Sequence, residues 1–460
     1  MLQMQTNENT EQMNWTRKYW LIVGCISMLA LTYLGSCLYT TQVKPDVPVQ
    51  IALEWNRFLL DAELNTEGYR GPVAARTYGY VGLAAYESAL PALPGYVSLS
   101  GLFTEMKLPG SPEFEKFDSG VALNAAYATI MENFFMSSPE TIKNKLRDLR
   151  QRWENELKEK LDASIFAYSS RYGEEVALGI FEWSKTDSLG YNANHHNYDR
   201  NYKPPFGPGK WITSASIPMP ALLPYWGDVR PFVIQTDNYI AKAVPEYSTE
   251  PSQFYHMQAM EVLTLSKPLS GENKWITDFW NDDRPGLTFS PAGHWLSITN
   301  QVIEKELPPI DKTLETYLRV GFALSDAIIA CWKAKYKYNV ERPETFIQKN
   351  IDPDWRPYFP TPSFPSYPSG HSMMGAAAAS VLNSMYGDEY NIQDRSHDGL
   401  RDFQTNPRSF NSFKEMAEEN ALSRILMGVH YRMDCEEGLR LGDLIGNEIS
   451  QLKLEESLTQ

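Results

Sequence analysis

Apolar residues recur three and four positions apart along several long stretches of the chain, which is the spacing of one face of an α-helix. Residues 51–62 carry such a stripe, formed by Ile51, Trp55, Phe58, Leu59 and Ala62. Residues 142–161 carry a second one, formed by Ile142, Leu146, Leu149, Trp153, Leu157 and Leu161. No stretch alternates apolar and polar residues for long enough to require a β-sheet. The pattern therefore predicts an all-α fold with proline-rich connections.

A long loop is expected over residues 186–232. It contains "NANHHNYDRNYKPPFGPGKW" and "PMPALLPYWGDVRP", which are too rich in Pro, Gly and Asn for regular structure but carry many aromatic side chains. Long loops of this kind often line functional sites. We interpret the adjacent His195 and His196 as surface residues rather than metal ligands, because no cysteine or carboxylate pattern accompanies them.

The length of 460 residues permits one large domain or two to three smaller ones. We expect an N-terminal helical region over residues 39–235, which includes the long loop. A C-terminal helical bundle is expected over residues 236–460, and it holds the residues with candidate chemistry.

The first 38 residues read as an export segment. Arg17 and Lys18 precede an apolar stretch at 19–38 that ends in "LGSC" at Cys37, a pattern similar to a bacterial lipobox. A lipoprotein, an uncleaved membrane anchor and a plain signal peptide are all compatible with it. Each predicts an exported protein, either periplasmic, at the cell surface or anchored to the membrane only through this segment.

Composition narrows the classes of partner. Hydrophobic residues make up 43% and charged residues 22% of the chain, which is typical of a globular protein. The formal net charge of −15 argues against nucleic acid or an anionic membrane surface as the main partner, because both require basic patches. Any anion site must therefore be built from local cations. Cys331 and Cys435, the cysteines beyond the export segment, are interpreted as buried thiols.

The first candidate for such a site is a lysine on an apolar helical face. A helix is predicted over residues 314–335, and one of its faces carries Leu318, Gly321, Ser325, Ile328, Trp332 and Lys335. Taken alone, Lys335 could be a lysine that extends its charged end to water. Arg342, however, precedes Pro343 and should leave the helical conformation close to Lys335. Two neighbouring cations require an anion between them or a carboxylate such as Glu341.

The second candidate is the start of a helix in "FPSYPSGHSMMGAAAAS", residues 364–380. Pro368, Ser369, Gly370 and His371 precede a run of small helix-forming residues. A helix N-terminus presents unpaired N–H groups to an anion, a hydroxyl adds a donor, and glycine permits close approach of the backbone. His371 would lie at the rim of that site and could transfer a proton. The tetrapeptide alone could equally be a turn and a helix cap.

The third candidate lies in "ALSRILMGVHYRMDCEEG". Arg424 offers a second guanidinium, and His430 is followed four residues later by Asp434. These two residues either share a helical face, or the carboxylate caps the next helix while it orients the imidazole. Together the three segments supply cations, a hydroxyl, an amide and two histidines, a donor set suited to a tetrahedral or trigonal-bipyramidal oxyanion.

The order and spacing of these three segments resemble the tripartite signature of the vanadium haloperoxidase and type 2 phosphatidic acid phosphatase superfamily. Looser similarity extends upstream through "FWNDDRPGLTFSPAGHW" and "GPVAARTYGYVGLAAYESAL". The chain is similar to the soluble bacterial haloperoxidase branch. The resemblance implies a helical-bundle fold and a site for phosphate or vanadate.

The resemblance also implies a role for each signature residue. His430 would bind vanadium of vanadate, or act as the nucleophile of a phosphatase. The anion's other oxygens would be held by Lys335, Arg342, Arg424, Ser369 and Gly370. His371 would be the acid and base, and Asp434 would fix the tautomer of His430. Asp283 in "FWNDDRPG" resembles an acidic residue that pairs with the second arginine in fungal haloperoxidases.

The signature does not separate a peroxidase from a phosphatase. Trp332 and Phe364 match an aromatic pair that walls the vanadate pocket in fungal chloroperoxidases and marine bacterial iodoperoxidases, although both could also be ordinary core residues. With the signature beside them they favour a halide pocket, although the pair does not determine which halide is preferred. The expected activity is the oxidation of halide, with iodide or bromide favoured, by hydrogen peroxide to hypohalous acid. The expected cofactor is vanadate, without haem or flavin. The alternative is a phosphatase that acts through phosphohistidine. The oligomeric state is not predicted.

Overall fold

The computed structural model describes residues 45–112, 116–213, 219–282, 284, 286–399 and 406–456. Residues Asp46–Gln460 form one compact unit, which is described here by itself. The predicted export segment with Cys37, and also Asp283, lie outside the described residues. Among the helices that the structure describes, none combines the length and apolar character needed to cross a membrane.

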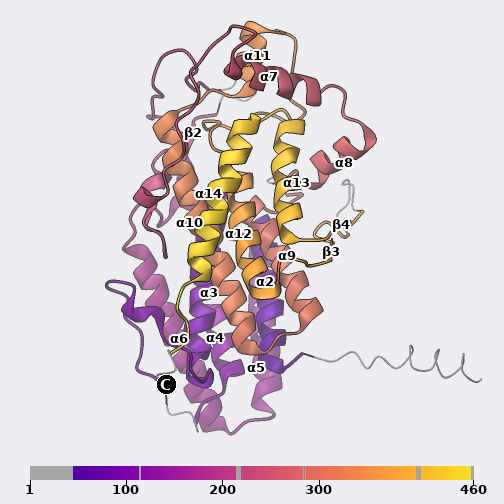
Figure 1. Ribbon diagram of the computed structural model, residues 1–460. Helices are drawn as coiled ribbons and strands as arrows, with labels where there is room; N and C mark the ends of the chain where they lie inside the picture. Colours follow the sequence, from indigo (N-terminus) through magenta and orange to yellow (C-terminus); the bar gives the residue numbers. More distant parts are fainter. Residues whose placement is uncertain are drawn as a thin grey trace, which may run out of the picture. The chain divides into compact units, whose positions relative to one another are not determined.

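The unit is built from α-helices (Figure 1). In chain order they are α2 (Val47–Asn65), α3 (Pro72–Ala89), α4 (Ser119–Phe134), α5 (Glu140–Lys158), α6 (Ala163–Lys185), α7 (Phe254–Leu265), α8 (Gly271–Phe279), α9 (Pro291–Glu306), α10 (Ile310–Tyr338), α11 (Pro343–Asn350), α12 (Gly370–Tyr386), α13 (Phe413–Leu426) and α14 (Arg432–Ser450). Short 3₁₀ turns lie at Leu90–Ala92, Leu99–Gly101, Ala193–His195, Trp226–Asp228 and Thr236–Asn238.

Two small antiparallel sheets complete the described structure. Strand β1 (Tyr198–Asp199) pairs with β2 (Ala221–Leu222), and β3 (Ile392–Asp394) pairs with β4 (Arg408–Phe410). The register aligns Tyr198 with Leu222 and Ile392 with Phe410. These pairs are too short to change the fold class, and the predicted all-α fold is confirmed. The sequence pattern missed them because strands of two or three residues show no measurable alternation.

Helix α3 lies at the centre of the unit, and every residue from Pro72 to Ala89 is buried. It packs against α10 at glycines. A Cβ added to Gly82 would lie 3.2 Å from the Cα of Leu318, and one added to Gly321 would lie 2.9 Å from the Tyr78 carbonyl oxygen. The close approach of these two helices therefore depends on residues without side chains.

Helices α12, α13 and α14 run side by side in the C-terminal half (Figure 1). Ser369 is the N-cap of α12, and its Oγ accepts a hydrogen bond from the Ser372 backbone N–H at 3.3 Å. The predicted helix after Pro368 is thus confirmed, although it begins at Gly370, two residues before the helix-forming run at Ser372 that was expected to start it. Helix α14 begins at Arg432, and Asp434 lies in its first turn. These two helix starts bring the second and third signature segments together.

The other local predictions can be compared directly. The stripe at 51–62 lies in α2, and the predicted helix at 314–335 lies within α10. Helix α5 ends at Lys158, so Leu161 lies beyond the helix predicted to include it. Within 186–232, the described residues 186–213 and 219–232 contain only short turns and strands, in agreement with the predicted loop. The division of the chain at residue 235 stays a prediction.

Candidate active site

Lys335 is fully buried in the last turns of α10. Its Nζ donates to the carbonyl oxygens of Pro365 at 2.9 Å and of Ser366 at 2.8 Å. The ammonium is therefore held inside the protein, and the alternative of a lysine extended to water is excluded. Burial lowers the pKa of Lys335 to about 7, and the nearby Arg342 also lowers it. An anion beside this group would restore its positive charge.

Arg342 is the N-cap residue of α11 and has an extended backbone, as predicted from the proline after it. Its side chain is 1% exposed. Its Nε donates to the Phe364 carbonyl oxygen at 2.9 Å, and its Nη1 donates to the Val429 carbonyl oxygen at 2.8 Å. Burial lowers its pKa to about 10, whereas Asp434 opposes that shift. Asp434, rather than the suggested Glu341, is the carboxylate that acts on both Lys335 and Arg342.

His430 is held between Arg342 and Asp434. Arg342 Nη1 lies 3.1 Å from His430 Nε2, and Asp434 Oδ2 lies 2.9 Å from His430 Nδ1. A guanidinium can only donate and a carboxylate accepts, so Nδ1 carries the proton and Nε2 carries the lone pair. Burial, together with the charges of Arg342 and Lys335, holds the pKa of His430 well below its usual value. The imidazole is therefore neutral and able to bind an electrophilic centre through Nε2.

Of the two arrangements predicted for Asp434, the structure shows the second, in which the carboxylate caps the next helix while it orients the imidazole. It lies in the first turn of α14, where Oδ2 accepts the Tyr431 backbone N–H at 3.1 Å while it also accepts from His430. The Ser366 hydroxyl donates to the same oxygen at 2.5 Å. Burial raises the pKa of Asp434 to about 6. The carboxylate thus caps the helix and orients the imidazole at the same time.

Ser369 and Gly370 form the start of α12. Ser369 Oγ accepts from the Ser372 backbone and lies 2.9 Å from the Ser372 hydroxyl, so its first function is to cap the helix. A Cβ added to Gly370 would lie 3.3 Å from the Trp332 ring. The absence of a side chain at residue 370 therefore keeps the wall of the adjacent cavity open.

His371 lies in the first turn of α12 and lines that cavity. Its Nε2 is buried and has no hydrogen-bond partner among the residues that the structure describes. Burial, followed by the charges of Arg424 and Lys335, holds its pKa well below the usual value. His371 is therefore a neutral imidazole next to several cations, and it could accept a proton from a molecule in the cavity.

Arg424 lies near the end of α13, and its Nη1 donates to the Trp280 carbonyl oxygen at 3.0 Å. It lines the same cavity as His371 and His430. Asp283, the acidic partner predicted for it, lies outside the described residues, so that pairing stays a prediction.

The cavity has a volume of about 40 Å³, enough for a few water-sized groups. One wall is formed by Trp332 and Phe364, whose ring centroids lie 4.9 Å apart at 42°. Lys335 Nζ lies 5.1 Å from the centroid of Phe364. The remaining lining residues are Gly71, Pro72, Leu222, Pro291, Ile328, Pro362, Gly370, His371, Met374, Arg424 and His430. The predicted aromatic pair therefore lines the cavity and also lies close to the buried ammonium of Lys335.

The donor set fits an oxyanion such as vanadate. Lys335, Arg342 and Arg424 all lower the pKa of His430, and Asp434 is the carboxylate that acts on Lys335 and Arg342. Arg342 Nη2 is also buried, and within the described part of the chain it has no acceptor. Leaving a desolvated cationic donor unpaired costs free energy. A bound anion would remove that cost.

Two features of this region were missed by sequence reasoning. Ser366, which supports Asp434, lies within the quoted stretch "FPSYPSGH" but was given no role. A second buried group, behind Arg424, consists of Asp282, His294, Asp394 and His397. Asp282 and His294 lie in the quoted "FWNDDRPGLTFSPAGHW". No spacing rule joins these four residues, because they come from separate elements.

Comparison with known proteins agrees with this geometry. Residues 315–456 match the family model described as the VCPO second helical-bundle domain. The vanadium chloroperoxidase of Curvularia inaequalis is 28% identical over 214 residues, which cover 34% of this chain and 35% of the relative. The vanadium-dependent bromoperoxidase of Ascophyllum nodosum is 35% identical over 97 residues, which cover 18% and 17%. The matched segments thus span about a third or less of these two relatives.

Similarity to solved structures extends over more of the chain. A structure reported as the first bacterial vanadium-dependent iodoperoxidase has 27% identity and a TM-score of 0.79, and the match covers 91% of this chain and 100% of that one. A holo-type bacterial vanadium-dependent chloroperoxidase has 16% identity and a TM-score of 0.63, over 83% and 92% of the two chains, and this similarity shows the fold. The chain therefore belongs to the vanadium haloperoxidase and type 2 phosphatidic acid phosphatase superfamily.

Proposed function

We propose that this protein is a vanadate-dependent haloperoxidase, which oxidises halide with hydrogen peroxide to hypohalous acid. The observation that carries the proposal is the neutral His430, whose Nε2 lone pair lies 3.1 Å from Arg342 in a cavity that His371 and Arg424 also line. Similarity to a bacterial iodoperoxidase over 91% of the chain supports the peroxidase above the phosphatase.

The binding of vanadate would be shared among the residues of the cluster. His430 would offer its Nε2, and this would release Arg342 Nη1 to contact the anion. Lys335, Arg342 and Arg424 would neutralise the negative charge, and the N-terminus of α12 at Ser369 and Gly370 would add its positive dipole. When bound, vanadate supplies a Lewis-acidic centre that activates hydrogen peroxide toward attack by halide.

Proton transfer would belong to His371. Its buried Nε2 has no partner in the described residues, so it is available to a peroxide molecule that enters the cavity. The cations that lower its pKa would be neutralised by a bound anion, and His371 would then be a stronger base. Asp434 would keep the proton of His430 on Nδ1 throughout.

We propose iodide, and secondarily bromide, as the halide. The pair Trp332 and Phe364 forms a polarisable wall next to Lys335, and such a wall suits a large, weakly hydrated anion. The iodoperoxidase is also similar over nearly the whole chain.

The experiment compares two assays on the purified full-length protein. Vanadate-free protein receives orthovanadate, hydrogen peroxide and iodide or bromide, and a second sample receives para-nitrophenyl phosphate without vanadate. We expect halide oxidation only with vanadate, and its loss in His430→Ala. Rapid phosphate release, with vanadate acting solely as an inhibitor, would instead support the phosphatase.

We also propose that the chain is exported and attached to a membrane through its first 38 residues, with Cys37 as the lipidated residue. The basic flank, the apolar stretch and the "LGSC" sequence support this. In a bacterial host, labelled palmitate should be incorporated into the protein and not into Cys37→Ser. Equal labelling of both would exclude lipidation at Cys37.

A further inference from the structure

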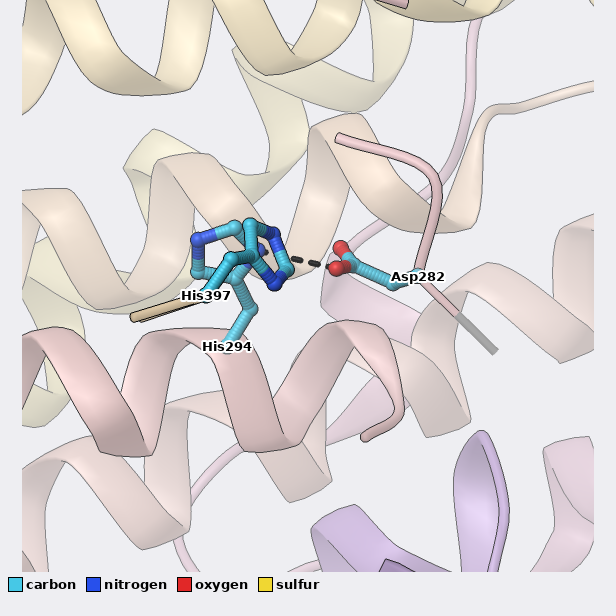
Figure 2. A group of neighbouring side chains, drawn as sticks. All are labelled: Asp282, His294 and His397. Atoms are coloured by element: carbon cyan, nitrogen blue, oxygen red, sulfur yellow. Dashed lines mark hydrogen bonds and ion pairs between the residues drawn. The ribbon is translucent and has the colours of Figure 1, made fainter. Parts of the chain in front are cut away.

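Behind Arg424 lies a buried group of ionisable side chains that the proposed function does not use. Asp282 follows α8, His294 lies in the first turn of α9, and His397 follows β3 (Figure 2). Asp282 is 5% exposed, His294 is fully buried and His397 is 1% exposed. Figure 2 shows the two imidazole rings and the carboxylate facing one another.

The three side chains present ligand atoms at short range. One nitrogen of His294, one of His397 and a carboxylate oxygen of Asp282 all lie within 4.8 Å of one another. His294 Nδ1 is 2.9 Å from Asp282 Oδ1. Ligand atoms of a tetrahedral zinc ion lie about 3.3 Å apart, so the widest of these separations would have to close by up to about 1.5 Å to complete the geometry.

The Nε2 atoms of His294 and His397 are both hydrogen-bonded. His294 Nε2 lies 2.9 Å from Asp394 Oδ2, and His397 Nε2 lies 2.7 Å from the Phe279 carbonyl oxygen. Histidines that bind metals almost always donate their second N–H to a carboxylate or a carbonyl oxygen, which fixes the tautomer. In the neutral imidazole of each residue, these bonds place the lone pair on Nδ1, and in His294 that nitrogen faces Asp282.

Asp282 supplies an independent observation. Its Oδ2 is buried and lacks a hydrogen-bond partner within the described ranges. The whole side chain of Asp282 is inaccessible to solvent. A buried carboxylate oxygen without a donor is costly, and a cation beside it would remove the cost.

We propose that Asp282, His294 and His397 bind one divalent transition-metal ion, with zinc as the ion that best suits two imidazole nitrogens and one carboxylate oxygen. This site is separate from the vanadate site at His430. The competing state is a proton in place of the metal. In that state burial lowers the pKa of His294, but Asp282 and Asp394 raise it to about 10, and the imidazolium bridges the two carboxylates.

The ion would have a defined structural effect. Trp280 stacks on His294 with centroids 4.5 Å apart at 26°, and the Trp280 carbonyl oxygen accepts the hydrogen bond from Arg424. Binding of Asp282, His294 and His397 to one ion would restrain Asp282, which lies two residues after Trp280, and also His294, on which Trp280 stacks. The metal would thus position one of the cations of the anion site without contacting the anion.

The test measures zinc binding to the full-length protein. Metal-free protein is titrated with zinc chloride in the presence of saturating tungstate, which occupies the anion site. We expect one zinc per chain, a higher melting temperature with zinc, and an X-ray absorption spectrum that shows two imidazoles and oxygen in the first shell. Stoichiometric binding should be lost in His397→Gln and in Asp282→Asn, and Asp394→Asn should weaken it about 10- to 100-fold.

Two controls separate this site from others. The double variant His195→Ala/His196→Ala removes exposed histidines and should bind zinc as the unmodified protein does, and so should His430→Ala. Absence of stoichiometric zinc in the unmodified protein would overturn the proposal, and so would undiminished binding by His397→Gln. Zinc that is displaced by tungstate, or lost in His430→Ala, would place the metal at the anion site and would also overturn it. Because the stoichiometry and the spectrum use the unmodified protein, a variant that does not fold leaves the test intact.

Discussion

The single imidazole of His430 illustrates how much of the site depends on hydrogen bonds of fixed direction. Arg342 can only donate and the Asp434 carboxylate only accepts, so the pair fixes which nitrogen of His430 carries the proton. Ser366 and the Tyr431 backbone in turn hold Asp434. The reactivity of one ring nitrogen therefore depends on residues that do not touch the bound anion.

Substitution of Asp434 by asparagine tests this dependence. An amide can donate to Nδ1, which would favour the wrong tautomer and move the proton to Nε2. We expect vanadate and tungstate affinities to fall about 10- to 100-fold, as measured by isothermal titration calorimetry. Glu436→Gln, on the exposed side of the same helical turn, is the matched control and should bind normally. Equal affinities in the two variants would contradict the role of Asp434.

The pH dependence of anion binding tests Lys335. Its pKa in the folded protein is about 7, below the ordinary value of 10.5, because the ammonium is buried. Above pH 7 the free site has therefore lost this proton, and an anion must restore it. We expect tungstate, which stays a dianion over this range, to bind with proton uptake and to lose up to about tenfold in affinity per pH unit between pH 7 and pH 9.

Below pH 7 the lysine is already charged, and this contribution to the slope disappears. Lys335→Arg keeps its charge throughout, so its affinity should change less with pH. Calorimetry in buffers of different ionisation enthalpy counts the protons directly. A count near zero at pH 8 for the unmodified protein would show that Lys335 is charged without the anion. The same shift means that burial of Lys335 opposes folding below pH 10.5, and this opposition declines as the pH rises from 7 to 10.5, because the unfolded chain then holds a proton that the folded chain has released.

For single residues, the sequence was most informative where the residue type is unusual for its place in the local pattern. Lys335 on an apolar face and Arg342 before a proline could both be singled out without coordinates, and the structure buries both. Ser366 and His397 could not be found in this way. Their importance comes from partners far away in the chain, Asp434 and Asp282, that only the fold brings near.

At the scale of the elements, the contact between α12 and α14 determines where the anion site begins. Three glycines of α14, each four residues from the next, face backbone atoms of the α12 segment. An added Cβ would lie 2.7 Å from the Ser369 carbonyl oxygen at Gly438, 2.2 Å from that of Met373 at Gly442, and 2.4 Å from that of Ala377 at Gly446. The two helices are thus in backbone contact, and Ser369 and Asp434 are held in register by a backbone hydrogen bond of 2.9 Å.

Gly442→Ala should separate these helices. The new methyl group would overlap the Met373 carbonyl, which belongs to the backbone and cannot rotate away. We expect a loss of about 1–3 kcal/mol in the free energy of unfolding, measured with urea, together with weaker tungstate binding. Leu444→Ala on the exposed side of the same helix, where Leu444 is 46% accessible, should change stability by less than about 0.5 kcal/mol. Equal losses would contradict the close helix contact.

The elements differ in how well they could be predicted. The start of α12 was predictable to within a few residues because Pro368 restricts its own backbone and Ser369 is a residue type that caps helix N-termini. The strands β1 and β2 were not predictable, since each has two residues. They pair only because the fold brings together two segments that are far apart in the sequence. The end of α5 was predicted three residues too late, because the apolar stripe continues to Leu161 although the helix stops at Lys158.

At the scale of the whole molecule, the cavity draws on both halves of the chain. Gly71 and Pro72 come from the start of α3, and His371, Arg424 and His430 come from the C-terminal bundle. Helix α3 is buried along its whole length and packs against α10. The matched family model covers residues 315–456, so it does not include Gly71 and Pro72 of the cavity wall.

A division of the chain at residue 235 should therefore abolish binding. We expect a fragment of residues 236–460 to lack cooperative unfolding and tungstate binding, because the face of α10 that contacts α3 would be exposed. Co-expression with residues 39–235 should restore both. Thermal unfolding followed by near-ultraviolet circular dichroism, with calorimetry for binding, measures the outcome. A fragment that folds and binds alone would show that the C-terminal bundle is an independent domain.

The central claim is that an oxyanion binds to Nε2 of His430 within this cluster of cations. The most direct measurement is a crystal structure of the protein soaked in vanadate, with the vanadium located by its anomalous scattering. We predict one vanadium bonded to His430 Nε2, with its oxygens within hydrogen-bond distance of Arg342, Arg424 and the Gly370 amide. Vanadium bound elsewhere, or bound in the cavity without a bond to His430, would contradict the account.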